Sequence, residues 1–344
     1  MTDVQIRVES GLGRITLNRP KAINALTHVM VRDISAALLA WATDDSVRAV
    51  AVEGAGERGL CAGGDIRSIH QDAVTGGTGT LAFWAEEYRM NSRIAHFPKP
   101  YLAFMDGIVM GGGVGVSAHG TVRLVTERTR LAMPEVGIGL VPDVGGTYLL
   151  SRAPGELGTH IALTAASISA ADAIHCGLAD AFLPSAQWPA VLDALARGAE
   201  IAEAVAAHAT APGPSRLAAQ ADWIASCYAA DTVEEILDRL RAQGEDATAK
   251  EIESKSPTAL KVTLRALRRA RELPDLDSVL AQEYRVSAAC LRGHDLAEGI
   301  RAQVIDKDRA PRWSPAALAE VTEDTVAAYF DEPASPFCSE DSVA

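Results

Sequence analysis

Two acidic residues, Glu135 and Asp143, lie eight positions apart in an otherwise apolar, glycine-rich stretch between Met133 and Gly146. A carboxylate in apolar surroundings is destabilised unless it is paired or hydrogen-bonded, so its pKa tends to rise into the range used for acid–base or nucleophilic chemistry. A proline precedes each acid and fixes the backbone there. The stretch is therefore a candidate catalytic segment. The alternative is that both carboxylates only cap helix N-termini, where negative charge is favoured.

Two glycine loops, Leu60–Ile66 and Met110–Gly115, are the other segments whose residue types suit chemistry. Each follows a predicted strand and opens a predicted helix, so each offers unpaired backbone N–H groups. Without side chains nearby, a carbonyl oxygen can approach such amides closely, and two of them would form an oxyanion hole. The alternative is that both loops are only tight strand-to-helix turns. Neither has the pattern of a P-loop or of a dinucleotide-binding fingerprint.

The overall composition is that of a globular protein and narrows the classes of partner. The chain has 344 residues, 48% of them hydrophobic and 22% charged, with a net charge of −13. Nucleic acid and anionic membrane surfaces require clustered Lys and Arg, so neither is expected as a partner. The sequence also has no secretory signal pattern and no apolar run long enough to span a bilayer. The five cysteines are widely spaced and form no CxxC pair, which predicts free thiols and a cytoplasmic location.

Hydrophobic periodicity predicts an alternation of strands and helices in the first part of the chain. A β-hairpin is expected over 4–9 and 14–18, a helix over 24–42 and a strand over 47–52. Further strands are expected over 101–106, 122–126 and 130–133, with a glycine loop over 107–113 and a short helix over 114–119. From Gly155 onward the pattern is almost wholly helical, with helices expected over 161–164, 170–176, 188–207, 232–243, 257–271, 276–291 and 296–305.

This order of elements predicts a layered α/β domain followed by a helical region. We place the α/β domain at residues 1–210 and the α-helical C-terminal region at 211–332, with the join near Pro212-Gly213-Pro214. Residues 333–344 are expected to form a flexible tail. The segment 73–80, rich in glycine and threonine, is a candidate lid whose position the sequence does not give.

Four motifs resemble, in order and spacing, the crotonase (enoyl-CoA hydratase/isomerase) superfamily. They are Cys61-Ala62-Gly63-Gly64-Asp65-Ile66, Gly111-Gly112-Gly113, Pro134-Glu135 and Pro142-Asp143-x-Gly-Gly. Within the superfamily the sequence is most similar to the 3-hydroxyisobutyryl-CoA hydrolase branch. The segments that suggest this branch are Glu86–Asn91, Ser256–Thr263 and Glu298–Trp313.

The resemblance implies a fold, a reaction and a set of site residues. The fold would be a crotonase-like β/α spiral core of small stacked sheets with an α-helical C-terminal region. The reaction would be hydrolysis of a short β-hydroxyacyl-CoA thioester, most simply 3-hydroxyisobutyryl-CoA in valine catabolism. No metal and no cofactor are implied, because coenzyme A enters as part of the substrate. The oligomeric state stays open, since many crotonase relatives form a homo-oligomer but the hydrolase branch need not. The implied site consists of Glu135 and Asp143 as catalytic residues, the amides of Gly64 and Gly112 as the oxyanion hole, Glu87 as a substrate contact, and Lys21, Ala62, Gly63, Asp65 and Ile66 along the coenzyme A moiety.

Two alternative functions remain open from the sequence. The first is an enoyl-CoA hydratase or isomerase, which is disfavoured because hydratases have a second glutamate where this chain has Gly115. The second is a non-catalytic acyl-CoA-binding protein. Within the hydrolase reading, Glu135 could attack the thioester directly or activate water, with Asp143 binding the β-hydroxyl group.

Other candidate residues have weaker support. The histidines lack metal-ligand spacing, and Cys61 lacks an obvious base, so structural roles are expected for both. The basic run Arg265–Arg271 is either a solvated helix face or a contact for coenzyme A phosphates.

Overall fold

The computed structural model describes residues 2–331, whose contacts group into two compact units. We call residues 2–64, 89–132 and 167–218 the sheet unit, and residues 65–88, 133–166 and 219–331 the helical unit. Each unit is therefore assembled from three separate stretches of chain rather than from consecutive halves. The division predicted near residue 210 stays a prediction, and the tail predicted over 333–344 lies outside the described residues.

The sheet unit contains a six-stranded sheet in the order β1-β2-β3-β4-β6-β8. The strands β1 (Val4–Glu9) and β2 (Leu12–Leu17) form the predicted antiparallel hairpin, and the following strands pair in parallel. Ser10 and Gly11 both have positive φ, at 52° and 81°, as a two-residue type I′ turn requires. The parallel strands are β3 (Ala49–Gly54), β4 (Tyr101–Met105), β6 (Val122–Val125) and β8 (Ala181–Phe182).

A second, two-stranded sheet in the same unit joins β5 (Ile108–Met110) to β7 (Arg130–Ala132) in parallel. The prediction of a glycine loop over 107–113 was wrong for its central residues, because they form β5. Three residues are too few to show a periodicity, so it is the pairing with β7 that makes this segment a strand.

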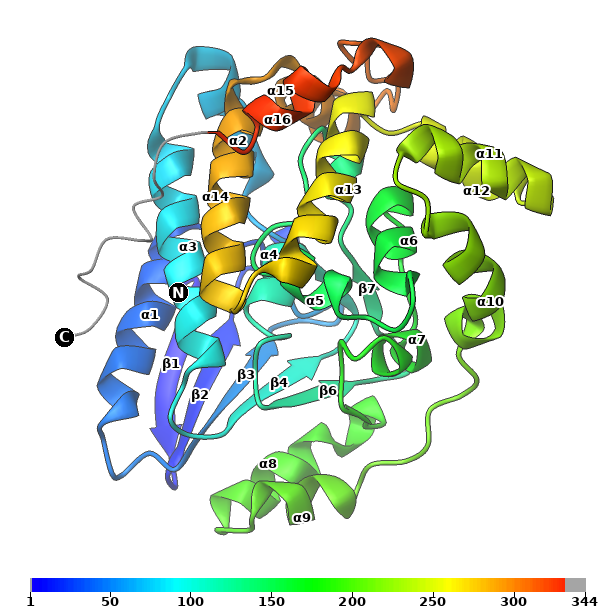
Figure 1. Cartoon of the computed structure of the whole chain (residues 1–344). Helices are drawn as coiled ribbons and strands as arrows, with labels where there is room; N and C mark the ends of the chain where they lie inside the picture. The colour runs from blue at the N-terminus through cyan, green and yellow to red at the C-terminus, as the bar shows by residue number, and fades with distance from the viewer. Residues whose placement is uncertain (1, 332–344) are drawn as a thin grey trace. The chain divides into compact units, whose positions relative to one another are not determined.

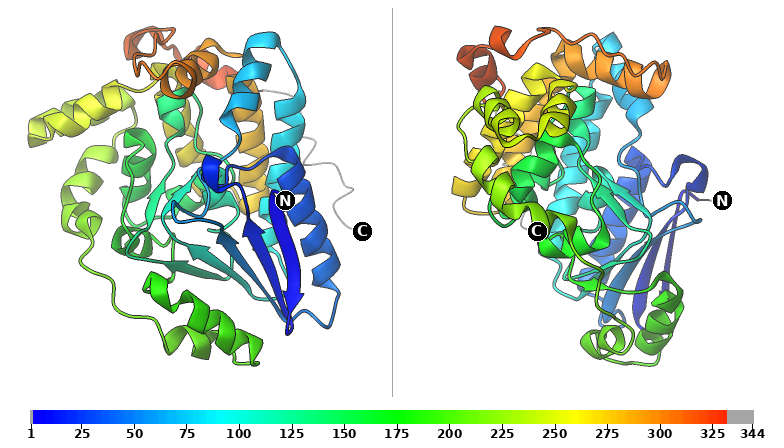
Figure 2. Two further views of the ribbon diagram at one scale, coloured as in Figure 1. Left: turned by 180° about the vertical axis from the view of Figure 1, so that it is seen from behind. Right: turned by 90° about the vertical axis from the view of Figure 1, so that its right-hand side faces the viewer.

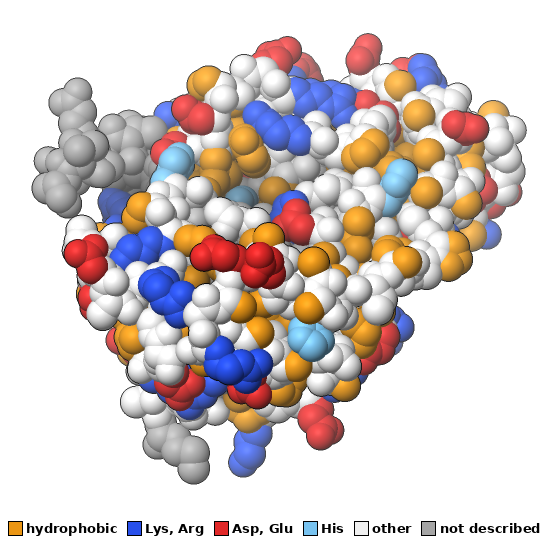
Figure 3. Space-filling view, turned by 90° about the horizontal axis from the view of Figure 1, so that it is seen from below, with side chains coloured by type: hydrophobic (Ala, Val, Ile, Leu, Met, Phe, Trp, Pro, Cys, Tyr) orange, Lys and Arg blue, Asp and Glu red, His pale blue; other side chains and the backbone are white. Residues whose placement is uncertain are grey.

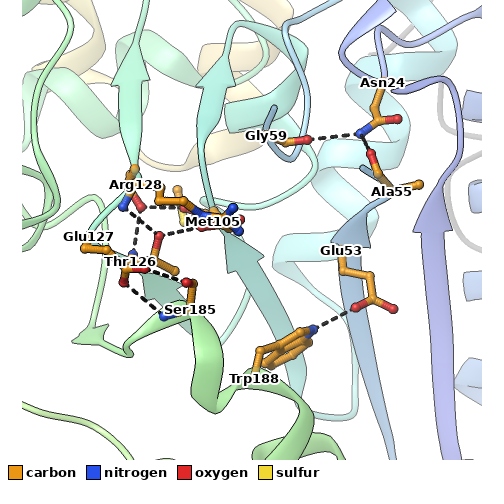
Figure 4. A network of polar contacts seen from close by, with 12 residues as sticks. Asn24, Glu53, Ala55, Gly59, Met105, Thr126, Glu127, Arg128, Ser185 and Trp188 are labelled. Carbon is orange, nitrogen blue, oxygen red and sulfur yellow. Dashed lines mark hydrogen bonds and ion pairs between the residues drawn. The ribbon is translucent and has the colours of Figure 1, made fainter. Parts of the chain in front are cut away.

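Helices cover the larger sheet. On one face, Leu12, Ala51 and Phe104 pack against the helix pair α8 (Trp188–Ala196) and α9 (Ile201–Ala206), below the sheet in Figure 1. The rings of Phe104 and Trp188 stack with their centroids 4.5 Å apart, and the Trp188 indole N–H donates to Glu53 over 2.7 Å (Figure 4).

The same helix pair departs from the sequence prediction, which had one continuous helix over 188–207. The chain breaks at Arg197–Glu200, where Gly198 adopts a φ of +91°, and a second helix starts at Ile201. The apolar periodicity continues through the break because both helices bury their small and branched residues against the same sheet, which hides the turn from a periodicity argument. Figure 2 shows the two helices from two further directions.

The helical unit is built almost wholly of helices, as the sequence predicts for the region after Gly155. Helix α13 packs on α5 and α6, and α14 packs on α5 and α2. The predicted helix over 296–305 is α15 followed by a π-helical turn, Arg301–Ile305. The remaining bounds are α2 (Ile66–Thr75), α3 (Gly79–Ala95, shared between the units), α5 (Gly146–Ser151), α6 (Leu157–Thr164), α10 (Arg216–Tyr228), α11 (Val233–Gln243), α12 (Asp246–Glu253), α13 (Pro257–Glu272), α14 (Leu276–Arg292), α15 (His294–Ile300) and α16 (Glu323–Ala328).

The sheet unit's remaining helices are α1 (His28–Ala42), α4 (Gly112–Gly115) and α7 (Ala170–His175). Helix α1 is shorter than the predicted 24–42, because its N-cap is Thr27, whose hydroxyl accepts from the Met30 amide. The candidate lid over 73–80 comprises the end of α2, the connection 76–78 and the start of α3, and the Asp72 carboxylate accepts from the Thr80 amide and hydroxyl.

Candidate active site

Glu135 opens a 3-10 turn, η2 (Glu135–Ile138), directly after β7 and Pro134. Its side chain is 5% exposed, and its Oε2 atom has no hydrogen-bond partner among the described residues. Helix α15 fixes the turn by close contact, since a Cβ atom at Gly299 would lie 2.5 Å from the Ile138 carbonyl oxygen. The structure thus holds Glu135 rigidly, in a buried position, with one acceptor atom unused. Glu135 is also the acidic residue in the first turn of η2, and a hydrogen bond from its own backbone amide lowers its pKa, so the helix-capping alternative stays open.

Asp143 is also 5% exposed, and its Oδ2 atom accepts a hydrogen bond from the Tyr88 hydroxyl over 2.7 Å. The next two residues, Val144 and Gly145, have positive φ values of 53° and 80° before α5 begins. A β-branched residue in this region is strained by about 1–3 kcal/mol, so the surrounding contacts must determine the turn. Asp143 therefore directly precedes a strained turn, and functional residues are often found beside such strain.

Glu283 on α14 supplies contacts that hold this turn. Its carboxylate is 1% exposed and accepts from the Gly145 amide at 2.6 Å, the Thr147 amide at 2.8 Å and the Thr147 hydroxyl at 2.5 Å. Another buried carboxyl, Glu87 on α3, is 2% exposed and has its Oε1 atom without a hydrogen-bond partner in the described part of the chain. The helical unit thus brings together Glu87, Glu135 and Asp143 as predicted, and adds Glu283.

All four carboxyl groups have a raised pKa. Burial is the main cause in each case; it raises the pKa of Asp143 to about 6 and that of Glu283 to about 8, and those of Glu87 and Glu135 well above their usual range. The negative charge of Asp143 is a further cause for the other three. The hydrogen bond from the Tyr88 hydroxyl opposes the effect of burial at Asp143, because it lowers the pKa of that carboxyl group.

These shifts predict that the protein loses stability as the pH rises above about 5. A buried carboxyl with a raised folded pKa binds its proton more tightly in the folded state, so its contribution is complete below the unfolded pKa of about 4 and is lost as the pH rises through the folded pKa. Within that window each such group lowers the free energy of unfolding by on the order of 1 kcal/mol per pH unit. For Glu283 the window extends to about pH 8. Thermal unfolding at pH 5, 6.5 and 8 should show a falling midpoint; a midpoint that rises from pH 6.5 to 8 would contradict this electrostatic picture.

The two glycine loops lie side by side within the sheet unit, as an oxyanion hole requires. Cys61 bridges to Val109 in parallel, and the Met110 amide donates to the Cys61 carbonyl over 3.0 Å. Gly112 is the first residue of α4, so its N–H has no acceptor within that helix. The structure therefore brings the predicted loops of Gly64 and Gly112 together. Whether their amides bind an oxyanion stays a prediction.

Close contact between the loops predicts that Gly113→Ala is damaging. A Cβ atom at Gly113 would collide with the Cys61 carbonyl oxygen and lie 3.0 Å from the Cys61 Cβ. The loops would have to separate, which should destabilise the protein by about 1–3 kcal/mol and lower turnover about 10²–10³-fold if an amide donor is displaced. Gly213→Ala is the matched control, because nothing lies within 4 Å of its Cβ position. Full turnover in Gly113→Ala would argue against an oxyanion hole in these loops.

Three of the residues predicted to lie along coenzyme A belong to the sheet unit, namely Lys21, Ala62 and Gly63. The exposed Lys21 lies in a turn that is tied to the first glycine loop, because the Ala62 amide donates to the Ile23 carbonyl over 2.9 Å. The buried Asn24 side chain donates to the Ala55 and Gly59 carbonyls, both at 3.0 Å (Figure 4). Asp65 and Ile66 begin α2 of the helical unit. Their role in coenzyme A binding, and that of Lys21, Ala62 and Gly63, stays a prediction.

Tyr88, Glu283 and Ser287 belong to the candidate site but were not predicted from the sequence. A signal for the last two was available, because both fall on the buried stripe of α14 at helical spacing with Val279, Leu280 and Val286. A glutamate on such a stripe indicates a buried carboxyl with specific partners. The stripe resembles ordinary hydrophobic core only if Glu283 and Ser287 are ignored.

The basic run on α13 has partners within the chain. Arg268 and Arg271 both pair with Glu156, at 2.7 and 2.9 Å, while Arg265 pairs with Glu323. Arg269 lies over the Phe330 ring at 4.8 Å. These contacts favour the structural reading of the run over contact with coenzyme A phosphates. Cys61 is fully buried, as expected for a packing residue.

Three further properties concern metal ions, membranes and surface charge. Within residues 2–331 no group of three or more His, Cys, Asp or Glu side chains is arranged to hold a metal ion. No helix in this part of the chain is long and apolar enough to cross a membrane. On the face shown in Figure 3, acidic and basic side chains are interspersed, without a broad patch of either sign.

Comparison with known proteins matches the chain along almost its whole length. A family model described as enoyl-CoA hydratase/isomerase matches residues 12–330. The 3-hydroxyisobutyryl-CoA hydrolase, mitochondrial, of Rattus norvegicus is 43% identical over 331 residues, which cover 92% of this chain and 86% of that protein. The protein of the same name from Gallus gallus is 41% identical over 337 residues, covering 94% and 87%.

Solved structures with the same fold carry other descriptions. A carnitinyl-CoA dehydratase from Mycobacterium thermoresistibile is 54% identical, with a TM-score of 0.94 and coverage of 98% of each chain. An enoyl-CoA hydratase from Rhodobacter sphaeroides 2.4.1 is 43% identical, with a TM-score of 0.90 and coverage of 96% of this chain and 98% of that one. The predicted crotonase-like α/β fold is thereby confirmed.

The prediction of a cytoplasmic location was wrong, because these curated relatives are named as mitochondrial proteins. The prediction rested on free thiols, and Cys61, Cys176, Cys227 and Cys290 are indeed buried and unbridged. Buried thiols escape disulfide formation in any compartment that keeps thiols reduced, so they do not distinguish one such compartment from another.

Proposed function

Because this chain belongs to the enoyl-CoA hydratase/isomerase family, we propose that it hydrolyses 3-hydroxyisobutyryl-CoA to 3-hydroxyisobutyrate and coenzyme A, a step of valine catabolism. The observation that carries the proposal is the buried pair of Glu135 and Asp143 in a chain that has Gly115 where hydratases have a second glutamate. Relatives at 41–43% identity are named for this hydrolase activity.

Thioester hydrolysis requires three kinds of group in the protein. They are hydrogen-bond donors for the carbonyl oxygen as it becomes negative, a base or nucleophile, and a group that orients the acyl chain. We assign the first role to the amides of Gly64 and Gly112, and the second to Glu135, whose Oε2 atom is unused. Asp143 and Glu87 take the third role by binding the β-hydroxyl group. Lys21, Ala62, Gly63, Asp65 and Ile66 are assigned to the coenzyme A moiety.

Glu135 can act in two ways that balance chemically. As a base it accepts a proton from water, the hydroxide adds to the thioester carbon, and the C–S bond breaks with the proton passing to the thiolate. As a nucleophile it adds to the same carbon and expels the thiolate, and water then hydrolyses the resulting anhydride. Both routes need Glu135 ionised, so its raised pKa predicts that activity grows with pH on the acidic side. Hydrolysis in oxygen-18 water under single turnover distinguishes the routes, since only the anhydride leaves label in Glu135.

A second candidate function is reversible removal of water from a β-hydroxyacyl-CoA. It is favoured by one observation, the 54% identity to a chain described as a carnitinyl-CoA dehydratase. Gly115 weighs against it, because it lies buried in α4 without a side chain that could act as acid or base.

The test measures two signals on the purified protein. Release of free thiol is followed with 3-hydroxyisobutyryl-CoA, 3-hydroxypropionyl-CoA, acetyl-CoA and crotonyl-CoA, and the enoyl chromophore is followed with crotonyl-CoA and carnitinyl-CoA. Thiol release confined to the β-hydroxyacyl substrates supports the hydrolase. A change in the chromophore without thiol release supports the dehydratase or hydratase, and binding without either reaction supports an acyl-CoA-binding protein. Sedimentation of the same preparation determines whether the protein is a monomer or a homo-oligomer.

A further inference from the structure

We propose that Tyr88 is a positioning residue that keeps Asp143 ionised and oriented, and that Ser287 on α14 in turn fixes the Tyr88 hydroxyl. The proposal rests on the proposed function in that Asp143 is assigned to the reacting acyl group there. The contacts on which it stands all lie within the helical unit.

The direction of the hydrogen bonds follows from the number of protons. The Tyr88 hydroxyl lies 2.7 Å from Asp143 Oδ2 and 3.2 Å from Ser287 Oγ. A phenol has one proton, and a carboxylate oxygen can only accept, so the Tyr88 proton goes to Asp143. The Ser287 hydroxyl then donates to the Tyr88 oxygen. Such a chain polarises each successive bond, which strengthens the bond to the carboxylate.

Burial makes this chain effective and keeps it in place. Tyr88 and Ser287 are both fully buried, so water does not compete for the phenol or the hydroxyl. The backbone after Asp143 is held separately, because Glu283 on the same helix accepts from Gly145 and Thr147. Helix α14 therefore acts on Asp143 in two ways. Ser287 contacts Tyr88, which binds the Asp143 side chain, and Glu283 binds the turn that follows Asp143.

Burial opposes the charge of Asp143, and no cation is among the described groups that interact with it. The titratable groups that interact with it are Glu87 and Tyr88 on α3, Glu135 on η2, and Glu283 and Cys290 on α14. None of these five is a cation. The Tyr88 bond is the side-chain contact that lowers the pKa of Asp143, while desolvation by burial raises it. Removing the phenol hydroxyl should thus take away the larger of the two hydrogen bonds that lower the pKa of Asp143, and leave the one from its own backbone amide.

The experiment compares Tyr88→Phe with Tyr228→Phe, a matched loss of a buried phenol hydroxyl. Tyr228 is also fully buried in the helical unit, but its hydroxyl lies 2.9 Å from His160 Nδ1 instead of Asp143. The first readout is the titration of Asp143 in protein labelled with carbon-13 at the aspartate carboxyl group, with the signal assigned by its absence from Asp143→Asn. The second readout is the pH dependence of kcat/KM for thiol release.

In Tyr88→Phe the titration of Asp143 should move up from about 6 by about one pH unit, which corresponds to a tenfold change in its ionisation equilibrium. Glu135 must also be ionised for turnover, so the acidic limb of the rate profile reflects both carboxylates; activity should fall about tenfold at pH values below the Asp143 titration and little above it. Ser287→Ala should shift both in the same direction by less, and it serves as the second variant if Tyr88→Phe does not fold. Tyr228→Phe should leave the titration unchanged.

An unchanged Asp143 titration in folded Tyr88→Phe or Ser287→Ala would overturn the proposal, as would an equal shift in Tyr228→Phe. A loss of activity by the same factor at every pH would do so too, because it would indicate a purely structural role. The titration needs no substrate. A shifted titration in a protein that releases no thiol from any tested substrate would therefore support Tyr88 as a positioning residue and reject the proposed hydrolysis alone.

Discussion

Glu135→Gln should lower thiol release by about 10³-fold or more while leaving the fold intact, since general-base or nucleophilic groups contribute at least about 10²–10⁴ in rate. Glutamine has the shape of the protonated glutamic acid, and Glu135 already holds its proton tightly in the ligand-free site because its pKa is raised. The substitution therefore removes the chemistry at small structural cost. Circular dichroism and the thermal midpoint report on the fold, and a thiol assay reports on turnover.

Glu272→Gln is the control for this prediction, because Glu272 is exposed at the end of α13 in the same unit. It should retain full activity. The assignment of Glu135 fails if a folded Glu135→Gln protein keeps more than a tenth of the wild-type rate. The oxygen-18 experiment then has no purpose, and the search for the reacting group moves to Asp143 and Glu87.

Asp143→Asn should be nearly as inactive, with a loss of about 10²–10³-fold, and should also change the pH dependence of stability. Asparagine keeps an acceptor for the Tyr88 hydroxyl but removes the charge that raises the pKa of Glu87, Glu135 and Glu283. The free energy of unfolding should then fall less steeply above pH 6 than in the wild type. Above neutral pH the variant should be as stable as the wild type or more so, the common outcome when a functional charge is removed from a buried site.

The measurement is thermal unfolding of both proteins between pH 5 and 8, alongside the thiol assay. Parallel stability curves for wild type and Asp143→Asn would show that Asp143 does not carry the charge that its neighbours sense. Full activity in Asp143→Asn would remove it from the site altogether. The two readouts are independent, because the first depends on the ligand-free protein and the second on the substrate.

The sequence by itself determined the elements that local patterns specify. The Ser10-Gly11 turn between alternating strands predicts the hairpin β1–β2, and the apolar periodicity after residue 257 predicts α13 and α14 nearly to their ends. Order and spacing of glycine, proline and acidic residues also predicted the family, because those residue types are needed at fixed places along the chain. Glu135 and Asp143 were found in this way, since charge in an apolar stretch is visible without a structure.

Tertiary structure alone decided those strands, helix ends and hydrogen bonds that depend on residues distant in the chain. β5 is a strand only because β7 pairs with it, and the break at Gly198 follows from the way α8 and α9 both pack on the sheet. Likewise Tyr88 and Ser287 lie 199 positions apart, yet their hydroxyl groups meet beside Asp143. Hydrogen bonds and electrostatic interactions between carboxyl groups act through space, whereas periodicity and motifs report only on neighbours along the chain. The sequence therefore identifies Glu135 and Asp143 as candidate reacting groups, and the fold determines their burial and their hydrogen-bond partners.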